Sequence, residues 1–413
     1  MILRSSSWVY IVTFVAILAV AGFLIFIFFP QDSSGPTEVP ESWEGILSQA
    51  NEEGHVKIFV DVELEVLSFL ETTVIPQFQE KHDIVVTIET GHWSGFTQRL
   101  IIERLGGRNI GLLDLALLGD EAMGRSLDAS LLFAETGRRL DKASQIEEIF
   151  RRGVSGISND GSSVTIWIDQ YVLVANAELL DDLPLDLGEI IALIAGEDQG
   201  LIDTDQLFVP NPLETDTGAA ALMLVVVDRG GKDLYSFRPH DRTLEEGWPE
   251  ALGFEIEDEP ELEGFPMPEE EAPENGLEAV IEGEISLAYL RYDQILLYIA
   301  EGGMLSPEIR VYLPEEGSII SGGHAGIPFN APNKSAALIF LDFLLSEEVQ
   351  IEFALELGKY PSIATITDDS LPELITASNF WIPRVEARGE WIAWPHYQYR
   401  VDLLDLWRNL TGE

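Results

Sequence analysis

Residues 321–361 have the sequence SGGHAGIPFNAPNKSAALIFLDFLLSEEVQIEFALELGKYP, which predicts the end of a strand followed by two helices in quick succession. Pro332 and Asn333 favour the start of the first helix, because Pro is tolerated in a first turn and an Asn side chain can accept a hydrogen bond from a free amide there. The residues that follow are apolar on nearly every side, so this helix should be buried. Ser346 favours the start of the second helix and Gly358 its end.

The composition limits the kinds of protein that this chain can be. It has 413 residues, which is enough for two domains with hydrophobic cores of their own. The net charge is −48, and this excess of acid argues against nucleic-acid binding because a polyphosphate needs a basic surface. The acidity fits a saline or acidic habitat, or an ordinary acidic protein. The absence of cysteine from the sequence excludes disulfides, thiolate metal ligands and a lipid-modified N-terminal cysteine.

The N-terminal segment is strongly apolar. Residues 9–29 form an uninterrupted apolar run of the length that spans a bilayer. We therefore expect residues 1–30 to form an uncleaved transmembrane signal-anchor and residues 31–54 a tether. Arg4 favours a cytoplasmic N-terminus, which would make this a single-pass protein of the cell membrane with its bulk extracytoplasmic. The alternative is a cleaved signal peptide with its processing site near residues 19–21.

Strands and helices alternate in the next part of the chain. Apolar, β-branched runs predict strands at 56–62, 84–89 and 112–118, and helical spacing predicts helices at 64–79 and 96–105. This alternation predicts βαβ units and a parallel sheet. In an open parallel sheet, ligands bind outside the carboxyl ends of the strands. The loops that follow the three strands are therefore candidate parts of a binding site.

These loops supply the first candidate ligand-binding residues. Asp61 and Glu63 follow the first strand, Trp93 and Ser94 the second, and Asp120 the third. Trp93 could stack on a ligand, or it could be a half-buried loop aromatic. Asp120 could bind a cationic group, or it could cap the next helix.

Two segments resemble extracellular solute-binding proteins of ABC importers. One is the 321–361 segment, with APNK and an Ala pair, FLDFLLSEEVQ and GKYP; the other is residues 277–290, LEAVIEGEISLAYL, with a helix, GE and a strand in order. The order of elements over about residues 55–365 is similar to the same family, nearest to its iron, thiamine and polyamine binders. The resemblance implies an α/β fold like that of type II periplasmic binding proteins, with two lobes, crossing hinge strands and a cleft that closes on a ligand.

The resemblance also implies a division into lobes. The first lobe would comprise residues 55–168 and 289–326, and the second would comprise residues 169–288 and 327–413. In this division the two helices after residue 331 form the packing core of the second lobe. A helix at 187–194 and a solvated, Glu- and Pro-rich loop at 255–274 are also expected there.

The resemblance adds candidate site residues in three places. Residues 164–176 are similar to the family's crossing strand, a Pro-rich loop before a helix at 219–227 is similar to an element that often contacts ligand, and the residues at the end of 277–290 are similar to the return across the hinge. These elements would contribute Asp169, Gln170 and Tyr171, then Thr215, Asp216 and Thr217, then Tyr289, Arg291 and Tyr292. The alternatives are a core position for Tyr171, helix capping by residues 215–217, and an ion pair with a neighbouring acid for Arg291.

No recognisable catalytic motif accompanies these elements. The sequence has no GxSxG, HExxH or P-loop motif, and its six histidines lack metal-ligand spacing. We therefore expect no enzymatic activity, cofactor or metal. We expect instead a membrane-tethered substrate-binding component that delivers a small solute to an ABC permease and its ATPase, and the acid in the candidate loops favours a cationic solute. The alternatives are an anchored extracellular hydrolase with a carboxylate pair and a ligand-sensing ectodomain.

Overall fold

A computed structural model describes the larger part of the chain: residues 38–179, 207–213, 215–230, 275–303, 306–313 and 318–371, with isolated residues from 382 to 408. The predicted anchor at 1–30, the helix at 187–194 and the acidic loop at 255–274 lie outside the described residues. Within the described ranges, no helix combines the length and the apolar character that a bilayer crossing requires.

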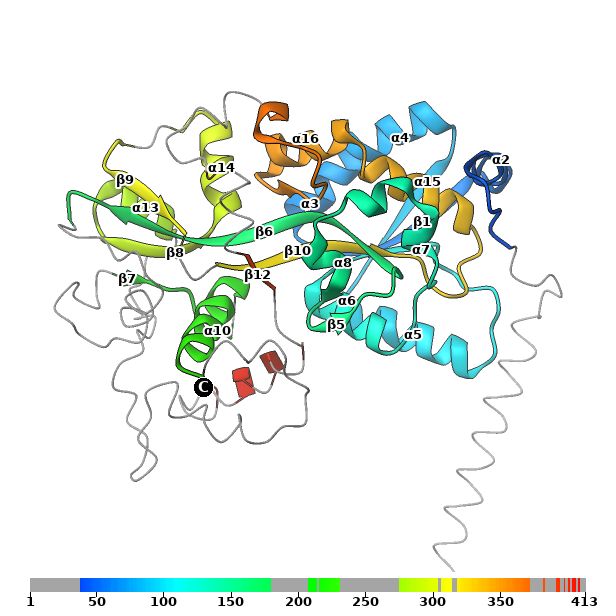
Figure 1. The fold of residues 1–413 in the computed structure, drawn as a ribbon, viewed down its shortest axis with the longest axis horizontal. Coiled ribbons are helices and arrows are strands. Elements are labelled where there is room, and N and C mark those ends of the chain that lie inside the picture. Colours follow the sequence, from blue (N-terminus) through cyan, green and yellow to red (C-terminus); the bar gives the residue numbers. More distant parts are fainter. Residues whose placement is uncertain are drawn as a thin grey trace, which may run out of the picture.

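The first lobe is built on the predicted parallel sheet. Strand β1 (His55–Asp61) lies between β2 (Val85–Thr90) and β3 (Leu115–Gly119), parallel to both. The next strand in the sheet, β10 (Ser318–Gly326), runs antiparallel to β3. The predicted strands are therefore confirmed, and their carboxyl ends share one edge of the sheet (Figure 1).

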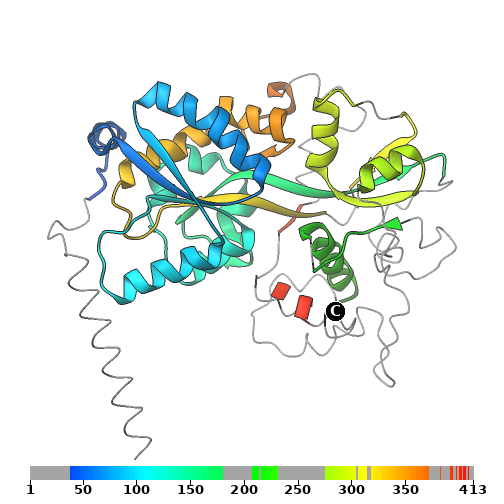
Figure 2. The same cartoon turned by 180° about the vertical axis from the view of Figure 1, so that it is seen from behind.

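Helices cover both faces of this sheet (Figures 1 and 2). The predicted helix at 64–79 is continuous as far as His82 but consists of α3 (Leu64–Phe69), a π-helical turn η1 (Leu70–Val74) and α4 (Ile75–His82). The other elements of this lobe are α5 (Trp93–Leu105), α6 (Asp120–Asp128), α7 (Thr136–Arg139), the 3-10 helix η2 (Asp141–Gln145), α8 (Glu148–Arg152), β4 (Gly153–Val154) and β5 (Ile157–Ser158).

Strand β6 (Ser163–Asn176) links the two lobes, and every one of its 14 residues is buried. Its first half pairs antiparallel with β10, and its second half pairs with β8 (Leu287–Arg291) and β9 (Ile309–Tyr312). Figure 1 shows β6 and β10 running side by side from one lobe toward the other. The predicted crossing strand is confirmed, and β10 is its partner.

The second lobe surrounds the second half of β6. Its described elements are β7 (Leu207–Phe208), α10 (Asp216–Gly230), α13 (Gly276–Glu282), β8, α14 (Tyr292–Ala300) and β9. We expected residues 289–326 in the first lobe. This is wrong for β9 and α14, because β9 pairs with the far half of β6 and α14 follows directly from β8. The chain returns to the first lobe only at β10 (Figure 1).

The helix pair from the opening segment belongs to the first lobe. Helix α15 (Lys334–Leu344) packs against α2 (Trp43–Glu53) and contacts β1, and α16 (Glu347–Leu357) follows it. The expectation of a second-lobe core is therefore wrong for these helices, although both form as predicted and α15 is almost wholly buried. Because α2 is folded against α15, the predicted tether at 31–54 is also too long. Short elements follow: β11 (Tyr360–Pro361), η5 (Asp368–Ser370) and β12 (Trp391–Ala393).

The glycines that end α2 and α16 provide a matched test of this packing. Gly54 and Gly358 have similar positive φ angles, 62° and 64°. A Cβ at Gly54 would meet nothing closer than a backbone oxygen at 3.7 Å, whereas a Cβ at Gly358 would lie 2.5 Å from the backbone oxygen of Asp293. We predict that Gly54→Ala lowers the free energy of unfolding by about 1 kcal/mol and Gly358→Ala by about 3 kcal/mol or more. Urea unfolding would measure both, and equal losses would contradict the close approach of α16 to α14.

Candidate ligand-binding site

A cavity of about 320 Å³ lies between the lobes, at the carboxyl ends of β1 and β3. Its walls come from the loop after β1, the first turns of α5, α6 and α10, the strands β6 and β10, and the end of β8. The sheet-end rule therefore located this region from the sequence. Eight of the predicted site residues line the cavity: Asp61, Glu63, Trp93, Asp120, Asp169, Tyr171, Asp216 and Arg291.

The alternation of side chains along β6 decides which residues of the crossing strand line the cavity. Trp167, Asp169 and Tyr171 all do so. Successive side chains of a strand point to opposite faces, and Gln170 accordingly does not line it and is 1% exposed. Tyr171 is also buried, and its ring stacks on Tyr289 with the centroids 6.1 Å apart.

The remaining predicted residues lie outside the cavity lining. Thr215 accepts a hydrogen bond from the backbone N–H of Gly218 at 3.0 Å, so it caps α10, and Thr217 is buried in the first turn of that helix. The Oγ of Ser94 lies 2.8 Å from the ring of His92. The hydrogen bond to Thr215 matches the capping alternative for the start of α10, whereas Ser94 lies in the first turn of α5.

The two remaining tyrosines, Tyr289 and Tyr292, pack in the protein interior. Tyr289 lies behind Tyr171, as its stacking shows. The hydroxyl of Tyr292 accepts the backbone N–H of Ile382 at 2.8 Å, and its ring stacks on Tyr360. Tyr289 therefore supports the cavity wall through Tyr171, and Tyr292 is part of the core beside Tyr360.

Five charged side chains form an ionic cluster at the point where the lobes meet: Glu63, Asp169, Arg291, Asp293 and Lys359. The buried ammonium of Lys359 donates to Asp169 at 2.6 Å and to Asp293 at 2.7 Å. It also donates to Oε2 of Glu63 at 2.9 Å. The guanidinium of Arg291 pairs with Asp293, through Nε to Oδ1 at 3.0 Å, and with Glu63. The cluster joins the loop after β1 and β6 to β8 and α14.

The cluster separates the pKa values of its two aspartates. Burial raises the pKa of Asp169 from 3.8 to about 6, because desolvation outweighs the attraction of Lys359 and Arg291. Burial also acts to raise the pKa of Asp293, but Lys359 and Arg291 outweigh it and hold that pKa well below its usual range. Asp293 is therefore the carboxylate that the two cations stabilise most.

Lys359 and Asp293 were not among the residues predicted for the site. Both lie next to elements that were predicted, Lys359 after α16 and Asp293 in the first turn of α14. Lys359 is 2% exposed, and burial of a lysine without a nearby carboxylate is costly. The signal available in the sequence was the GKYP motif at the end of an apolar helix. For Arg291, the ion-pair alternative describes the observed contacts.

The acids on the first-lobe side of the cavity have individual partners. Oδ2 of Asp61 accepts the backbone N–H of Trp93 at 2.6 Å and so holds the first turn of α5. Oδ2 of Asp120 accepts the backbone N–H of Gly322 at 2.6 Å, and its Oδ1 lies 3.2 Å from Nε2 of the fully buried His324. Asp120 therefore ties α6 to β10, and no side-chain cap of its own helix is present.

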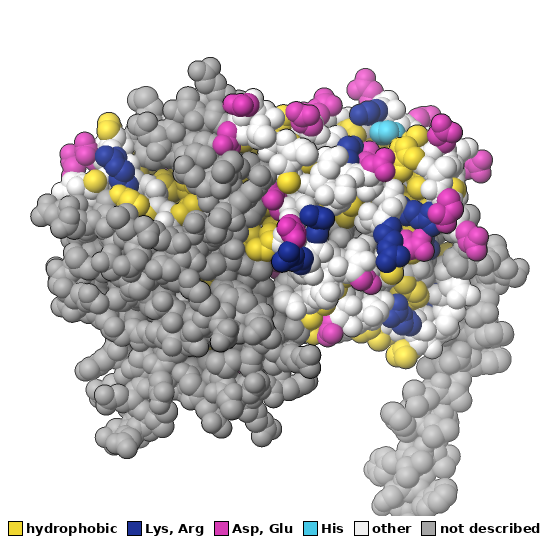
Figure 3. All heavy atoms as spheres, viewed as in Figure 1, with side chains coloured by type: hydrophobic (Ala, Val, Ile, Leu, Met, Phe, Trp, Pro, Cys, Tyr) yellow, Lys and Arg dark blue, Asp and Glu magenta, His cyan; other side chains and the backbone are white. Residues whose placement is uncertain are grey.

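Basic side chains also contact residues that line the cavity. Arg125 lies over the ring of Trp93 at 4.9 Å and pairs with Glu121 at 2.9 Å. Arg400 pairs with Asp216 at the start of α10. Figure 3 shows the same mixing on the surface, where acidic and basic side chains are interspersed over the first lobe. Among the described residues, no group of three or more His, Asp or Glu side chains could hold a metal ion.

Neither a protein-family model nor a curated protein matches this sequence. Solved structures do match. The spermidine/putrescine ABC transporter substrate-binding protein PotD from Streptococcus pneumoniae has a TM-score of 0.58 at 15% identity, covering 87% of this chain and 98% of its own. An ABC transporter protein from Clostridium perfringens has a TM-score of 0.58 at 17% identity, covering 86% and 98%. Iron-bound HitA from Pseudomonas aeruginosa has a TM-score of 0.55 at 17% identity, covering 86% and 99%.

The chain has the fold of the extracellular solute-binding proteins of ABC transporters. This confirms, at the level of the fold, the resemblance inferred from the sequence. The solved proteins differ in what their names say they bind, iron in one case and a polyamine system in another. The solute-binding fold therefore leaves the ligand to be decided by the residues that line the cavity.

The two aspartates of the cluster should respond differently to the loss of their charge. Asp293→Asn removes an acceptor of both cations, so we predict a loss of about 3 kcal/mol in the free energy of unfolding at pH 7. Asp169→Asn leaves Lys359 with two carboxylates and should cost much less. Urea unfolding of both variants checks this, and an equal or larger loss for Asp169→Asn would contradict it.

The raised pKa of Asp169 also predicts how the stability difference between Asp169→Asn and the wild type changes with pH. Because the pKa of Asp169 is raised on folding, its ionisation destabilises the wild type as pH rises from about 4 through 6. The Asp169→Asn variant should therefore gain stability relative to the wild type over this range, by up to about 3 kcal/mol. A constant difference from pH 4 to 7 would contradict the raised pKa.

Proposed function

We propose that this protein is the extracytoplasmic substrate-binding component of an ABC transporter and that it captures a small solute in the cavity between its lobes. The observation that carries the proposal is the position of that cavity. It lies at the carboxyl ends of β1 and β3, and both lobes and the crossing strands β6 and β10 line it, in a chain with the solute-binding fold. A cavity of about 320 Å³ is of the size that holds a small molecule.

The charges of the lining favour a solute with a cationic group. Six carboxylates and two guanidinium groups line the cavity. Most of these acids have basic partners, as Glu63 has in Lys359 and Asp216 has in Arg400. Asp61 has no Lys, Arg or His partner in the part of the chain that the structure describes; its one contact is with the backbone N–H of Trp93.

Two aromatic side chains of the same cavity lining belong to this proposed cation site. The rings of Trp93 and Tyr171 line the same cavity, and an aromatic face attracts a cation while an adjacent carboxylate neutralises it. A primary or secondary ammonium group that enters the cavity would meet Asp61 and these rings. The cationic solute is therefore the finer part of the proposal, and it rests on Asp61.

The proposed location is the outer side of the cell membrane, and the proposed partners are a permease and its ATPase. The apolar run at 9–29 would anchor the chain in the membrane as a single-pass protein, with the folded lobes outside the cell. A short tether before α2 would keep the lobes near the bilayer, where they would deliver solute to a permease coupled to an ATPase. No chemical step is proposed for the cavity.

Three four-carbon compounds test the proposed cation site: putrescine, 1,4-butanediol and succinate. We predict that putrescine raises the melting temperature of the full chain by a few degrees, because a ligand at about 100 times its dissociation constant stabilises the native state by about 2.7 kcal/mol. The neutral diol and the dianion should give smaller shifts. Differential scanning calorimetry in detergent measures all three.

Two variants assign the shift to the cavity. Asp61→Asn should abolish the putrescine shift. Asp83→Asn is the matched control, because Asp83 is an exposed carboxylate of the same lobe that does not line the cavity. Equal shifts for diol and diamine, or an undiminished shift in Asp61→Asn, would contradict the cation site.

A further inference from the structure

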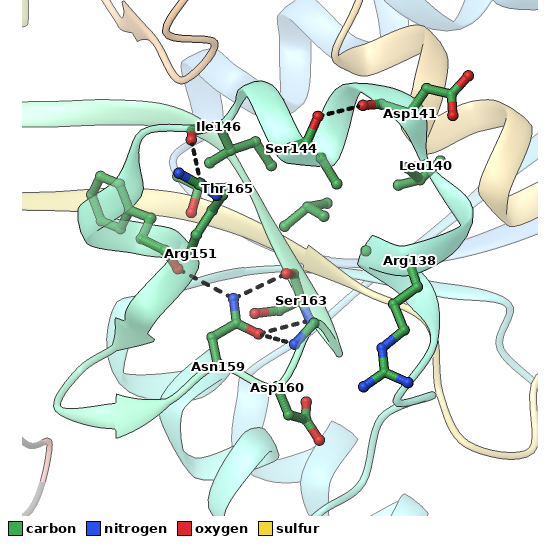
Figure 4. A pocket seen from close by; sticks show the side chains of 15 residues that line it. Arg138, Leu140, Asp141, Ser144, Ile146, Arg151, Asn159, Asp160, Ser163 and Thr165 are labelled. Carbon is green, nitrogen blue, oxygen red and sulfur yellow. Dashed lines mark hydrogen bonds between the residues drawn. The ribbon is translucent and has the colours of Figure 1, made fainter.

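A second cavity, of about 490 Å³, lies within the first lobe. It is open to solvent and is lined by α7, η2, α8, the loop at 159–161 and the first residues of β6 (Figure 4). It shares no lining residue with the cavity between the lobes. The proposed transport function does not use this cavity.

One wall of the second cavity is apolar. Leu140, Ile146 and Phe150 are buried and line it. Ala143 and Val164 extend the same wall. A hydrocarbon or aromatic group could bury its surface there, which is the usual character of most of a small-molecule site.

Several polar side chains of the cavity are already occupied. The amide of Asn159 donates to the backbone oxygens of Phe150 at 3.2 Å and Ser163 at 3.1 Å. Its oxygen accepts the backbone N–H groups of Gly161 at 3.1 Å and Ser163 at 3.4 Å. The hydroxyl of Thr165 bonds to the ring of His324 at 3.0 Å. These groups shape the wall and have little capacity left for a ligand.

Three donors among the lining residues keep hydrogen-bonding capacity: the buried hydroxyl of Ser163 and the guanidinium groups of Arg138 and Arg151, two exposed residues. The hydroxyl of Ser163 is buried and has no hydrogen-bond partner among the described residues. Within the described ranges, Arg138 has neither a hydrogen bond nor an ion pair through its side chain, and Arg151 donates only its Nε, to the backbone oxygen of Ile146 at 2.9 Å. A buried donor without an acceptor is costly, so an acceptor on a ligand would be favourable at Ser163. The two exposed arginines would add charge-assisted hydrogen bonds to the same acceptor.

The neighbouring arginines, in contrast, have acidic partners, as expected in a chain of net charge −48. Arg139 pairs with Glu135 at 2.5 Å, and Arg152 pairs with Glu148. Arg138 and Arg151, which line the cavity, have no acidic partner in the described part of the chain. Figure 4 shows them on opposite sides of the cavity.

The acids at the cavity do not supply the missing partners. Asp160 accepts the backbone N–H and the hydroxyl of Ser162. Asp141 lies at the outer edge of η2 in Figure 4, away from Ser163. Neither forms an ion pair with Arg138 or Arg151.

We propose that this cavity binds a small organic anion. Its carboxylate or phosphate accepts from Arg138, Arg151 and the hydroxyl of Ser163, and its apolar part lies on the wall of Leu140, Ile146 and Phe150. Guanidinium groups suit both acids because their donors form a planar fork that matches carboxylate and phosphate oxygens. The site is distinct from the cavity proposed for the transported solute.

Isothermal titration of the full chain with three probes tests the proposal: 3-phenylpropionate, phenyl phosphate and 3-phenylpropylamine. The wild type should bind at least one of the two anions, and the better anion identifies the acid group. The amine, which matches 3-phenylpropionate in shape, should bind at least tenfold more weakly. Absence of binding by both anions at millimolar concentration, or equal binding of the amine, would overturn the proposal.

Variants locate the bound anion. Arg138→Gln should weaken binding at least tenfold and leave the melting temperature unchanged, because its side chain has no hydrogen bond or ion pair to lose among the described residues. Arg152→Gln is the matched control, since it removes the same charge from α8 outside the cavity, and should change affinity less than twofold. Ser163→Ala should also weaken binding. Equal losses in Arg138→Gln and Arg152→Gln, or a loss in Asp61→Asn, would overturn the assignment to this cavity.

Discussion

The ammonium of Lys359 lies among three carboxylates at the junction of the lobes, and the geometry of the proposed site depends on it. Without this cation, Glu63, Asp169 and Asp293 would face one another in a largely buried place with only Arg291 to balance them. An uncompensated buried charge costs several kcal/mol, so the cluster is stable only while its members stay together. Because these members come from the loop after β1, from β6 and from α14, the cluster holds the first lobe, the crossing strand and the second lobe in one arrangement.

Because of this cluster, the net charge of the chain does not predict the charge of the ligand. A net charge of −48 suggests at first that any cavity would attract cations. In the cavity between the lobes, however, the protein's own arginines and lysine neutralise most of the carboxylates. The preference of this cavity for a cation then rests on Asp61 and the aromatic side chains of the same lining. The second cavity has arginines without acidic partners in the described residues, and it favours an anion. Local pairing, and not total charge, therefore sets the chemistry of each cavity.

Much of the fold could be predicted because it follows from patterns between residues that are near one another in the sequence. The βαβ alternation predicted the parallel sheet, and the sheet-end rule brought Asp61, Trp93 and Asp120 to one cavity. The lobe to which α15 and α14 belong could not be predicted, because it depends on which half of β6 and which face of the sheet each element packs against. Lys359 and Asp293 were missed for a related reason: their meeting joins residues 66 positions apart, and no local pattern records it. The second cavity depends on how α7, η2 and α8 pack, which again is a tertiary property.

We propose that the cavity between the lobes holds the solute. A crystal structure of the protein with the compound that stabilises it most tests this directly. The account predicts that the compound lies in the interlobe cavity, with a cationic group near the carboxylate of Asp61 and its body against the ring of Trp93 or Tyr171. A compound that is bound elsewhere and is absent from an unchanged interlobe cavity would contradict the account.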